Sequence, residues 1–322
     1  MSDVLSLVAD IGGTNTRLAL AKNGAVDAKT IQRFKNADAG SFEQIVGGYF
    51  TYMQDPACCA CCIAVAGPVR GVQAQMTNLD WIIDATGIGH SFNIPEVSLL
   101  NDLEALGHGL STLGRKDQNH ILGPEPAKGD QATKLVIGVG TGVNIAVVHA
   151  FAGGTTRITP AEYGHASLPI HSAQMLKLVS TLPLDGAYCS IEDALSGRGF
   201  ENLYRCVGAK NGRPAALSHA EIWAGLDDLQ DPDLAETAQY FVQFLASVTV
   251  DLSLCHLPFG GIYLAGGVAR KLAPYFDRFG FGAAFQAQDK KTDLMQAMGV
   301  TLIQDDYAAL KGCANFLAQK QV

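Results

Sequence analysis

The segment from Asp10 to Thr14 combines the side chains and the backbone freedom that a phosphate site needs. The apolar run from Val4 to Ala9 predicts a strand, which ends at an acid, two glycines and a threonine before a second strand. Paired glycines allow a tight turn whose N–H groups come close to an anion, because no Cβ intervenes. An aspartate beside a phosphate requires a cation between them, so the segment predicts Mg²⁺ and a nucleotide. A simple Gly-Gly hairpin remains the alternative.

Two further strands end in glycines in the same way. Residues 134–139 predict a strand, Gly140-Thr141-Gly142 a turn, and residues 143–149 the next strand. Residues 261–265 predict another strand, which ends at Gly266-Gly267 before a helix. Three such turns exceed what chance hairpins provide, and they indicate a duplicated fold with a nucleotide between its halves.

Asn101-Asp102 follows an apolar strand, residues 95–100, and precedes a helix from Leu103 to Leu110. Ligands of open α/β sheets bind at the carboxyl ends of strands, so this pair is expected to face a ligand. Asp102 also has the position of a helix cap. The two roles are compatible.

The remaining pattern predicts a mixed α/β fold. An antiparallel start is followed by alternating strands and helices, and residues 234–257 are apolar nearly all round, as in a buried helix. The other expected elements are strands at 4–9, 17–22, 28–34, 60–67 and 71–76, and a helix from Ser41 to Met53.

The chain has 322 residues and a net charge of −8, which favours two domains and argues against nucleic acid or an anionic membrane as partner. This charge repels ATP at long range, so a nucleotide site must rely on local N–H groups and a metal. No basic segment leads into an apolar stretch at the N-terminus, so we expect a cytoplasmic protein without a signal peptide. The uncharged stretch from Leu135 to Thr156 fits strand–turn–strand better than a membrane span.

Four of the eight cysteines lie together at 58, 59, 61 and 62, which raises the possibility of zinc. Neighbouring residues of a strand point to opposite faces, so at most two or three of these thiols could reach one ion. Because the segment continues as Ile63-Ala64-Val65-Ala66, we interpret these cysteines as small apolar core residues of a buried strand.

Together the turns resemble the superfamily of sugar kinases, heat-shock ATPases and actin, and within it the bacterial glucokinase family. The resemblance covers nearly the whole chain, in the family's order and spacing. It is carried by D-I-G-G-T-N-T-R-L-A-L at 10–20, A-G-P-V at 66–69, M-T-N-L-D-W at 76–81, L-L-N-D-L-E-A at 99–105, G-V-G-T-G-V at 138–143, E-Y-G-H at 162–165, S-I-E-D-A-L-S-G-R-G at 190–199 and Y-L-A-G-G-V at 263–268.

The resemblance implies two ribonuclease-H-like α/β domains, with mixed sheets flanked by helices and with nucleotide and sugar in the interdomain cleft. We expect a small domain of residues 1–110 with a C-terminal helix at 303–322, and a large domain of residues 111–302. A homodimer is expected.

The resemblance also implies ATP and Mg²⁺ as ligands, with Mg²⁺ held by Asp10 through water. The implied ATP-binding residues are Asp10, Gly12, Gly13, Thr14, Asn15, Gly140, Thr141, Gly142, Gly266 and Gly267. A tight strand-to-helix junction is the alternative explanation of the last two glycines.

For the sugar, the resemblance implies glucose, phosphorylated at its 6-hydroxyl with Asp102 as the base. Glu104 is a rival by spacing alone, although two positions along it should face elsewhere. Each sugar hydroxyl both donates and accepts, so carboxylates and amides suit it. The implied sugar-binding residues are Asn78, Asn101, Asp102, Glu162, His165 and Glu192.

One position departs from the family pattern: Asn144 stands where a glycine usually follows G-T-G-x. Asparagine tolerates positive φ, so we expect the turn to survive, with altered phosphate or sugar contacts. Relatives with E-x-G-H often carry a cysteine-rich zinc loop after it, but only Cys189 lies between His165 and Arg198, which argues against zinc here.

Two alternatives to a glucose kinase remain. One is a kinase of another hexose, such as fructose, mannose or an N-acetylated hexosamine. The other is a non-catalytic sugar sensor on the same fold, disfavoured because the first strand begins at Val4, because the chain is acidic, and because a sensor has no use for Asp102.

Overall fold

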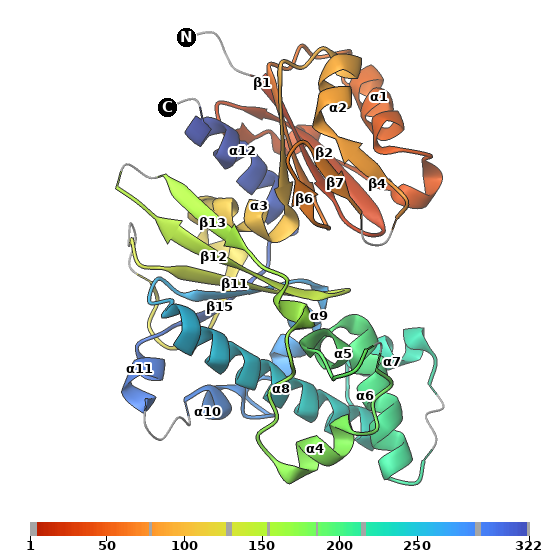
Figure 1. Cartoon of the computed structure of the whole chain (residues 1–322), viewed down its shortest axis with the longest axis vertical. Helices are drawn as coiled ribbons and strands as arrows, with labels where there is room; N and C mark the ends of the chain where they lie inside the picture. Colours follow the sequence, from red (N-terminus) through yellow and green to blue (C-terminus); the bar gives the residue numbers. More distant parts are fainter. Residues whose placement is uncertain are drawn as a thin grey trace. The chain divides into compact units, whose positions relative to one another are not determined.

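Figure 1 shows a computed structural model of the chain, which describes residues 5–76, 79–126, 131–152, 155–184, 186–213, 217–286 and 291–320. Its internal contacts divide it into two compact units. The first holds the described residues up to Gly114, the strand β13 (Thr156–Pro160) and those from Asp305 onward. The second holds the rest, up to Gln304. The division expected from the sequence had left β13 in the other domain.

The main sheet of the first unit has the strand order β3-β2-β1-β5-β9, and β4 also pairs with β2. Strands β1, β5 and β9 are parallel, and β2 is antiparallel to β1. A small antiparallel sheet, β6-β7-β8, follows β5. The strands are β1 (Leu5–Ile11), β2 (Asn15–Lys22), β3 (Ala25–Val26), β4 (Gln32–Lys35), β5 (Ala60–Val65), β6 (Val69–Arg70), β7 (Gln73–Gln75), β8 (Ile82–Asp84) and β9 (Glu96–Asn101).

Helices cover both faces of this sheet, because its central strands are apolar on both sides (Figure 1). Leu7 and Ile11 of β1 join the core under α1 and α2, whereas Val8 joins the core under α12. The helices are α1 (Phe42–Tyr52), α2 (Ala85–Phe92), α3 (Asp102–Gly109) and α12 (Ala308–Lys320).

The expected strand at 28–34 is wrong in its first half. Asp27 accepts a hydrogen bond from the Lys29 N–H and starts a 3₁₀ turn (Ala28–Thr30), so β4 begins only at Gln32. The local capping bond outweighs the modest strand propensity of this segment. The C-terminal helix is also shorter than the expected 303–322, because β15 extends to Ile303.

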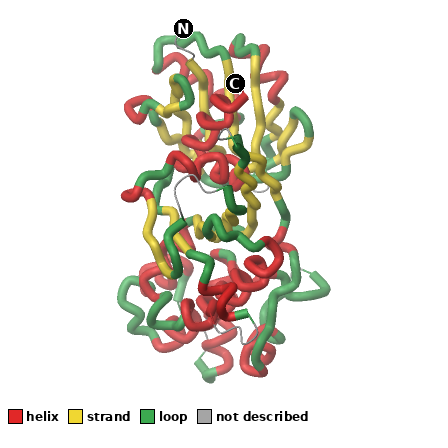
Figure 2. The backbone as a smooth tube through the Cα atoms, turned by 90° about the vertical axis from the view of Figure 1, so that its left-hand side faces the viewer, coloured by secondary structure: helices red, strands yellow, loops and turns green. Residues whose placement is uncertain are grey.

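The second unit repeats the plan of the first, with a hairpin followed by two parallel strands. Strand β11 is antiparallel to β12 and parallel to β14, which is parallel to β15, and the order is β10-β15-β14-β11-β12. Figure 2 shows the helices in red and the strands in yellow along the backbone. The strands are β10 (Gln118–Leu122), β11 (Lys134–Val139), β12 (Val143–Ala150), β14 (Ile262–Ala265) and β15 (Val300–Ile303). The repeated plan agrees with the duplicated α/β fold expected from the sequence.

One long helix, α8 (Pro232–His256), forms the centre of the second unit's core. Asp231 caps its first turn and Leu257, in the left-handed region, ends it. Among the described residues it is the one helix long and apolar enough to cross a membrane, but 61% of its apolar window is buried inside the protein, as in a core helix. The other helices are α4 (Ala173–Val179), α5 (Ile191–Leu195), α6 (Gly197–Lys210), α7 (His219–Gly225), α9 (Gly267–Leu272), α10 (Phe281–Gln286) and α11 (Thr292–Gln296).

Three of the four clustered cysteines are core residues, as expected. Cys61 and Cys62 lie in β5 and are fully buried, and burial raises the pKa of both thiols well above the ordinary value. Cys58 is buried as well, whereas Cys59 is exposed. Thiols that stay protonated are poor metal ligands, which supports a packing role.

His108 is a buried histidine on the helix that carries Asp102. Its Nδ1 lies 2.9 Å from the Thr156 hydroxyl of β13, and its ring packs edge-on against Phe316 of α12. Burial lowers the pKa of His108 to about 4. The residue is therefore neutral in the folded unit at neutral pH.

We expect His108 to make the first unit sensitive to acid. The unfolded chain binds the proton near pH 6.5, whereas the folded one does so only near pH 4. Stability is therefore full above about pH 6.5 and falls as the pH drops towards 4, by about 3 kcal/mol in all. Denaturant unfolding between pH 4.5 and 8 should show a flatter pH dependence for His108→Gln. His90→Gln, at an exposed site of the same unit, is the control, and an unchanged slope in His108→Gln would contradict the assignment.

Candidate active site

The turn between β1 and β2 is closed by its own backbone and braced by Asn36. The Gly12 N–H donates to the Asn15 carbonyl at 3.0 Å. Asn36, which is 2% exposed, donates from Nδ2 to the Gly12 carbonyl at 2.8 Å and from its N–H to the Thr14 carbonyl at 3.0 Å. A trans peptide directs N–H and carbonyl oppositely, so the Gly13 and Asn15 N–H groups point away from Asn36. This is the arrangement that an anion site requires.

Asp10 lies near the end of β1, directly across the hairpin from Arg17. Arg17 Nη1 donates to Asp10 Oδ2 at 2.9 Å. Burial raises the pKa of Asp10, and the charge and hydrogen bond of Arg17 oppose that rise. The sequence had placed Mg²⁺ at Asp10, and the structure adds an arginine that holds one of its oxygens.

Asp102 is the first residue of α3, and the cap is Asn101. Asn101 Oδ1 accepts from the Leu103 N–H at 3.0 Å, and Nδ2 donates to the Gly67 carbonyl at 3.3 Å. The capping role considered for Asp102 therefore belongs to its neighbour. Asp102 Oδ1 accepts from the Leu103 N–H at 2.9 Å, and the side chain is half-buried.

Glu104 completes this cap. Its Oε2 accepts from the Asn101 N–H at 3.3 Å, and burial raises its pKa. The carboxylate of Glu104 is directed back to the strand end, which disfavours it as a base.

The phosphate turn and Asp102 lie at the same edge of the first sheet. Strand β5 separates β1 from β9, and the register sets Ile11 beside Val65 and Val65 beside Asn101. Two strand spacings place Ile11 and Asn101 roughly 10 Å apart. The structure thus brings together Asp10, Gly12, Gly13, Thr14 and Asn15 with Asn101 and Asp102 at the carboxyl ends of parallel strands.

The second glycine turn, Gly140 to Gly142, joins β11 to β12. The Gly140 N–H donates to the Gly142 carbonyl, and the Gly140 carbonyl accepts from the Gly197 N–H, each at 2.9 Å. A Cβ on Gly140 would meet nothing within 4 Å, and Thr141 is exposed, so one side of the turn is open.

Glu192 lies against this turn. Its Oε2 accepts from the Val143 N–H at 3.1 Å, and a Cβ on Gly142 would come within 2.6 Å of the same oxygen. A Cβ on Gly164 would lie 2.1 Å from the Val143 carbonyl. Gly142 and Gly164 are therefore required for the close approach of β12, the Glu162–His165 turn and α5.

Glu162 attaches to the same strand through another side chain. Its Oε2 accepts from Asn144 Nδ2 at 3.1 Å. His165 is exposed, and its carbonyl accepts from the Tyr188 hydroxyl at 2.6 Å. The structure therefore gathers Glu162, His165 and Glu192 around the first residues of β12, whereas Asn78 lies outside the described residues.

Gly266 has φ +101°, and a Cβ there would come within 2.2 Å of the Val139 carbonyl. This glycine is required by the close approach of neighbouring strands β11 and β14. A Cβ on Gly267 would meet nothing within 4 Å. Of the pair, Gly267 is the one with space for a ligand.

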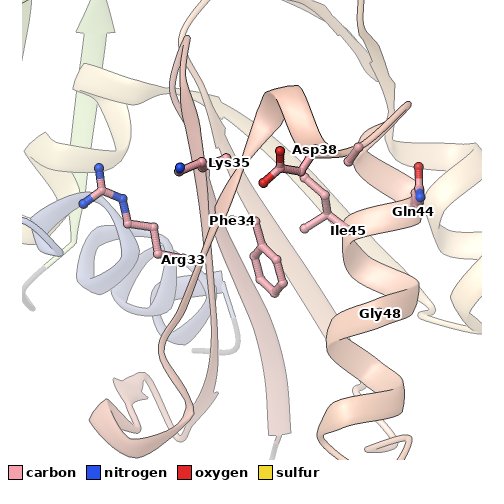
Figure 3. Close-up of a pocket in the computed structure, with 8 residues that line it drawn as sticks. Arg33, Phe34, Lys35, Asp38, Gln44, Ile45 and Gly48 are labelled. Carbon is pink, nitrogen blue, oxygen red and sulfur yellow. The ribbon is translucent and has the colours of Figure 1, made fainter.

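A cavity of about 470 Å³ lies beside β4, between this strand and α1 (Figure 3). Phe34 of β4 and Ile45 of α1 point into the space between the two elements, and Arg33 and Lys35 also line it. None of the described residues predicted for the site lines this cavity. Arg33 instead connects to the phosphate turn, since its Nε donates to Asn15 Oδ1 at 3.1 Å.

Known proteins resemble this chain over nearly its whole length. A family model described as Glucokinase matches residues 7–320. The chain belongs to the glucokinase family. The glucokinase of Saccharophagus degradans is 30% identical over 97% of this chain and 98% of its own length. The crystal structure of a glucokinase from an Antarctic psychrotroph has a TM-score of 0.84 and 27% identity, covering 98% of this chain and 99% of that one.

A more distant structure shares the fold alone. It is a ROK family glucokinase from Streptomyces griseus, solved in complex with glucose and AMPPNP. Its TM-score is 0.63 at 17% identity, with 98% of this chain and 99% of that chain covered.

Three residues of this glucokinase-family member adjoin the candidate site and were not predicted from its sequence. Asn36 braces the first turn, and Arg17 pairs with Asp10. Trp223 lies beside Gly197, whose Cβ position is 3.7 Å from the indole and 3.6 Å from the Gly140 carbonyl. Arg17 stood inside a recognised motif, but Asn36 and Trp223 carry no local signal.

We expect Asn36→Ala to weaken nucleotide binding selectively. Without the side-chain amide, the Gly12 carbonyl and the Thr16 hydroxyl lose their partner, so the direction of the Gly13 N–H is no longer fixed. The backbone N–H of residue 36 still bonds the Thr14 carbonyl. KM for ATP should rise on the order of tenfold with KM for glucose nearly unchanged, measured by coupled ADP release. Thr30→Ala, which removes a buried hydrogen-bonding side chain at the far end of β2, should destabilise the protein without changing KM for ATP. Equal effects of the two variants would assign Asn36 a merely structural role.

Proposed function

We propose that the protein transfers the terminal phosphoryl group of ATP to the 6-hydroxyl of glucose, giving glucose 6-phosphate and ADP at the entry to glycolysis. The observation that carries this proposal is the placement of Asp102 at the same sheet edge as the Asp10–Asn15 turn. A carboxylate that can accept a proton and a turn that can hold phosphate are the two parts this transfer needs.

In the proposed step, the glucose O6 forms a bond to the γ-phosphorus and the bond from that phosphorus to the β,γ-bridging oxygen breaks. Asp102 accepts the hydroxyl proton, and ADP leaves with the bridging electrons. The first turn of α3 favours the ionised carboxylate, which lowers its basicity. That is acceptable because a loose phosphoryl-transfer transition state requires proton removal late.

The phosphates would lie on the N–H groups of the two glycine turns, with the adenosine near Gly267. Mg²⁺ fits this donor set because it keeps most of its waters and needs few protein ligands beside ATP. Asp10 would accept a hydrogen bond from a metal-bound water. When bound, the ion neutralises charge on the β- and γ-phosphate oxygens.

Glu162, His165 and Glu192, with Asn78 and Asn101, would contact the sugar hydroxyls away from O6. Asn101 has bonds from both Oδ1 and Nδ2, so a sugar contact would use a remaining lone pair or amide hydrogen. The proposal requires Asp102 and these carboxylates to act on the same sugar molecule. It also includes a cytoplasmic location and a homodimer.

Asp102→Asn tests the base directly. The amide is nearly isosteric but does not accept the proton, so kcat should fall by roughly 10²- to 10⁴-fold while glucose binding, measured by calorimetry, persists. Near-normal turnover would exclude Asp102 as the base. A comparable loss in Glu104→Gln alone would transfer the role to that residue.

Sugar preference tests the substrate. Carboxylates placed to bond particular hydroxyls are left unpaired by an epimer or a deoxy sugar. Glucose should exceed 2-deoxyglucose, mannose and fructose in kcat/KM by roughly 10- to 100-fold, measured on the purified protein. Equal efficiency on fructose or N-acetylglucosamine would show that the assignment of glucose is wrong, while the assignment as a sugar kinase would stand. No turnover with any sugar would favour a non-catalytic sensor.

A further inference from the structure

Asn144 makes three hydrogen bonds that join β12 to the Glu162–His165 turn. Its Nδ2 donates to Glu162 Oε2 at 3.1 Å. Its Oδ1 accepts from the Tyr163 N–H at 3.0 Å and from the Ile145 N–H at 2.9 Å. The amide therefore contacts both the carboxylate of Glu162 and the peptide that follows it.

These contacts fix which way the amide points. Two backbone N–H groups face Oδ1, and a rotated amide would set its NH₂ group against two donors. Nδ2 must then face Glu162. The backbone of Asn144 is fixed as well, because it pairs with Gly138 of β11, and it is not among the residues with positive φ. The turn therefore survives at this position as expected, but without the positive φ that asparagine tolerates, since Asn144 continues β12.

Glu162 itself is exposed, so an unrestrained side chain would sample several rotamers. A carboxylate has about four acceptor sites, and the single bond from Asn144 leaves most of them for sugar hydroxyls. Because Asn144 is neutral, it restrains the carboxylate without cancelling its charge.

Glu192 is tied to the adjacent residue, through the Val143 N–H. The two carboxylates assigned to the sugar are thus held by consecutive residues of one strand. A shift of Glu162 relative to Glu192 would change which hydroxyl pattern the pair can accept.

We propose that Asn144 is a positioning residue that pre-orients Glu162 for the sugar and so sets sugar affinity. The inference rests on the proposed function, because it requires Glu162 to bind glucose. Restraining one flexible side chain before binding is worth a factor of about 2 to 10 in affinity.

The test uses Asn144→Ala and Asn144→Asp in the full-length protein. The Ala variant loses all three bonds, whereas Asp keeps an acceptor for both backbone N–H groups but loses the donor and adds a like charge beside Glu162. KM for glucose should rise about 2- to 10-fold in Ala and at least as much in Asp. KM for ATP and kcat should stay within about twofold, because only uniform sugar binding is lost. If Ala does not fold, Asp carries the test alone.

Asn211→Ala is the matched control, since Asn211 Nδ2 also donates to carboxylates, those of Asp233 and Glu236, each at 2.8 Å. KM for glucose should not change in this variant. Unchanged KM for glucose in both Asn144 variants would overturn the inference.

A double-mutant cycle separates this inference from the proposed function. Glu162→Gln alone should raise KM for glucose, and adding Asn144→Ala to it should cost less than in the wild-type background. Strict additivity would overturn the positioning role of Asn144. Absence of glucose phosphorylation by the wild type, or no effect of Glu162→Gln, would instead overturn the proposed function.

Discussion

Where a parallel strand ends, its last peptide groups lose their hydrogen-bond partners in the sheet. In both units, polar side chains supply hydrogen bonds to the backbone at these strand ends. Asn36 bonds the carbonyls of the turn after β1, Asn101 bonds the Gly67 carbonyl after β5, and Glu192 accepts the Val143 N–H after the turn that follows β11. Each side chain satisfies one side of a turn. The backbone groups on the other side are then available to a ligand, in a fixed direction.

A second constraint follows from this arrangement, because neighbouring segments approach closer than a Cβ allows. The positions that a Cβ would take are filled at Gly142 by a carboxylate, and at Gly164 and Gly266 by backbone carbonyls. Gly140 and Gly267 instead face open space. The glycines of one motif thus divide into those that the fold requires and those that leave room for a bound molecule. Sequence alone gives both kinds the same appearance.

This division explains how far the sequence could be interpreted. The strand-turn-strand segments at Asp10 and Gly140 are local patterns, and the structure has them where the sequence predicted them. The contacts of Asn36 with Gly12 and of Asn144 with Glu162 span 24 and 18 residues and depend on strand pairing that no local pattern specifies. The same reason explains why the sequence did not predict that β13 belongs to the first unit. Its Thr156 bonds His108, which lies 48 residues away in the sequence.

In a chain of net charge −8, the arginines near the first turn affect the protonation of Asp10 and the charge around the turn. Burial alone would favour a protonated Asp10, and a neutral carboxyl attracts a metal-bound water less than a carboxylate does. Arg17 opposes this rise in the pKa by pairing with one oxygen of Asp10. The arginine also lies opposite Arg33 in the neighbouring strand β4, so two cations flank the turn that would hold phosphate. The hairpin therefore places the Asp10 carboxylate and two arginines beside the turn to which the proposed function assigns the phosphate.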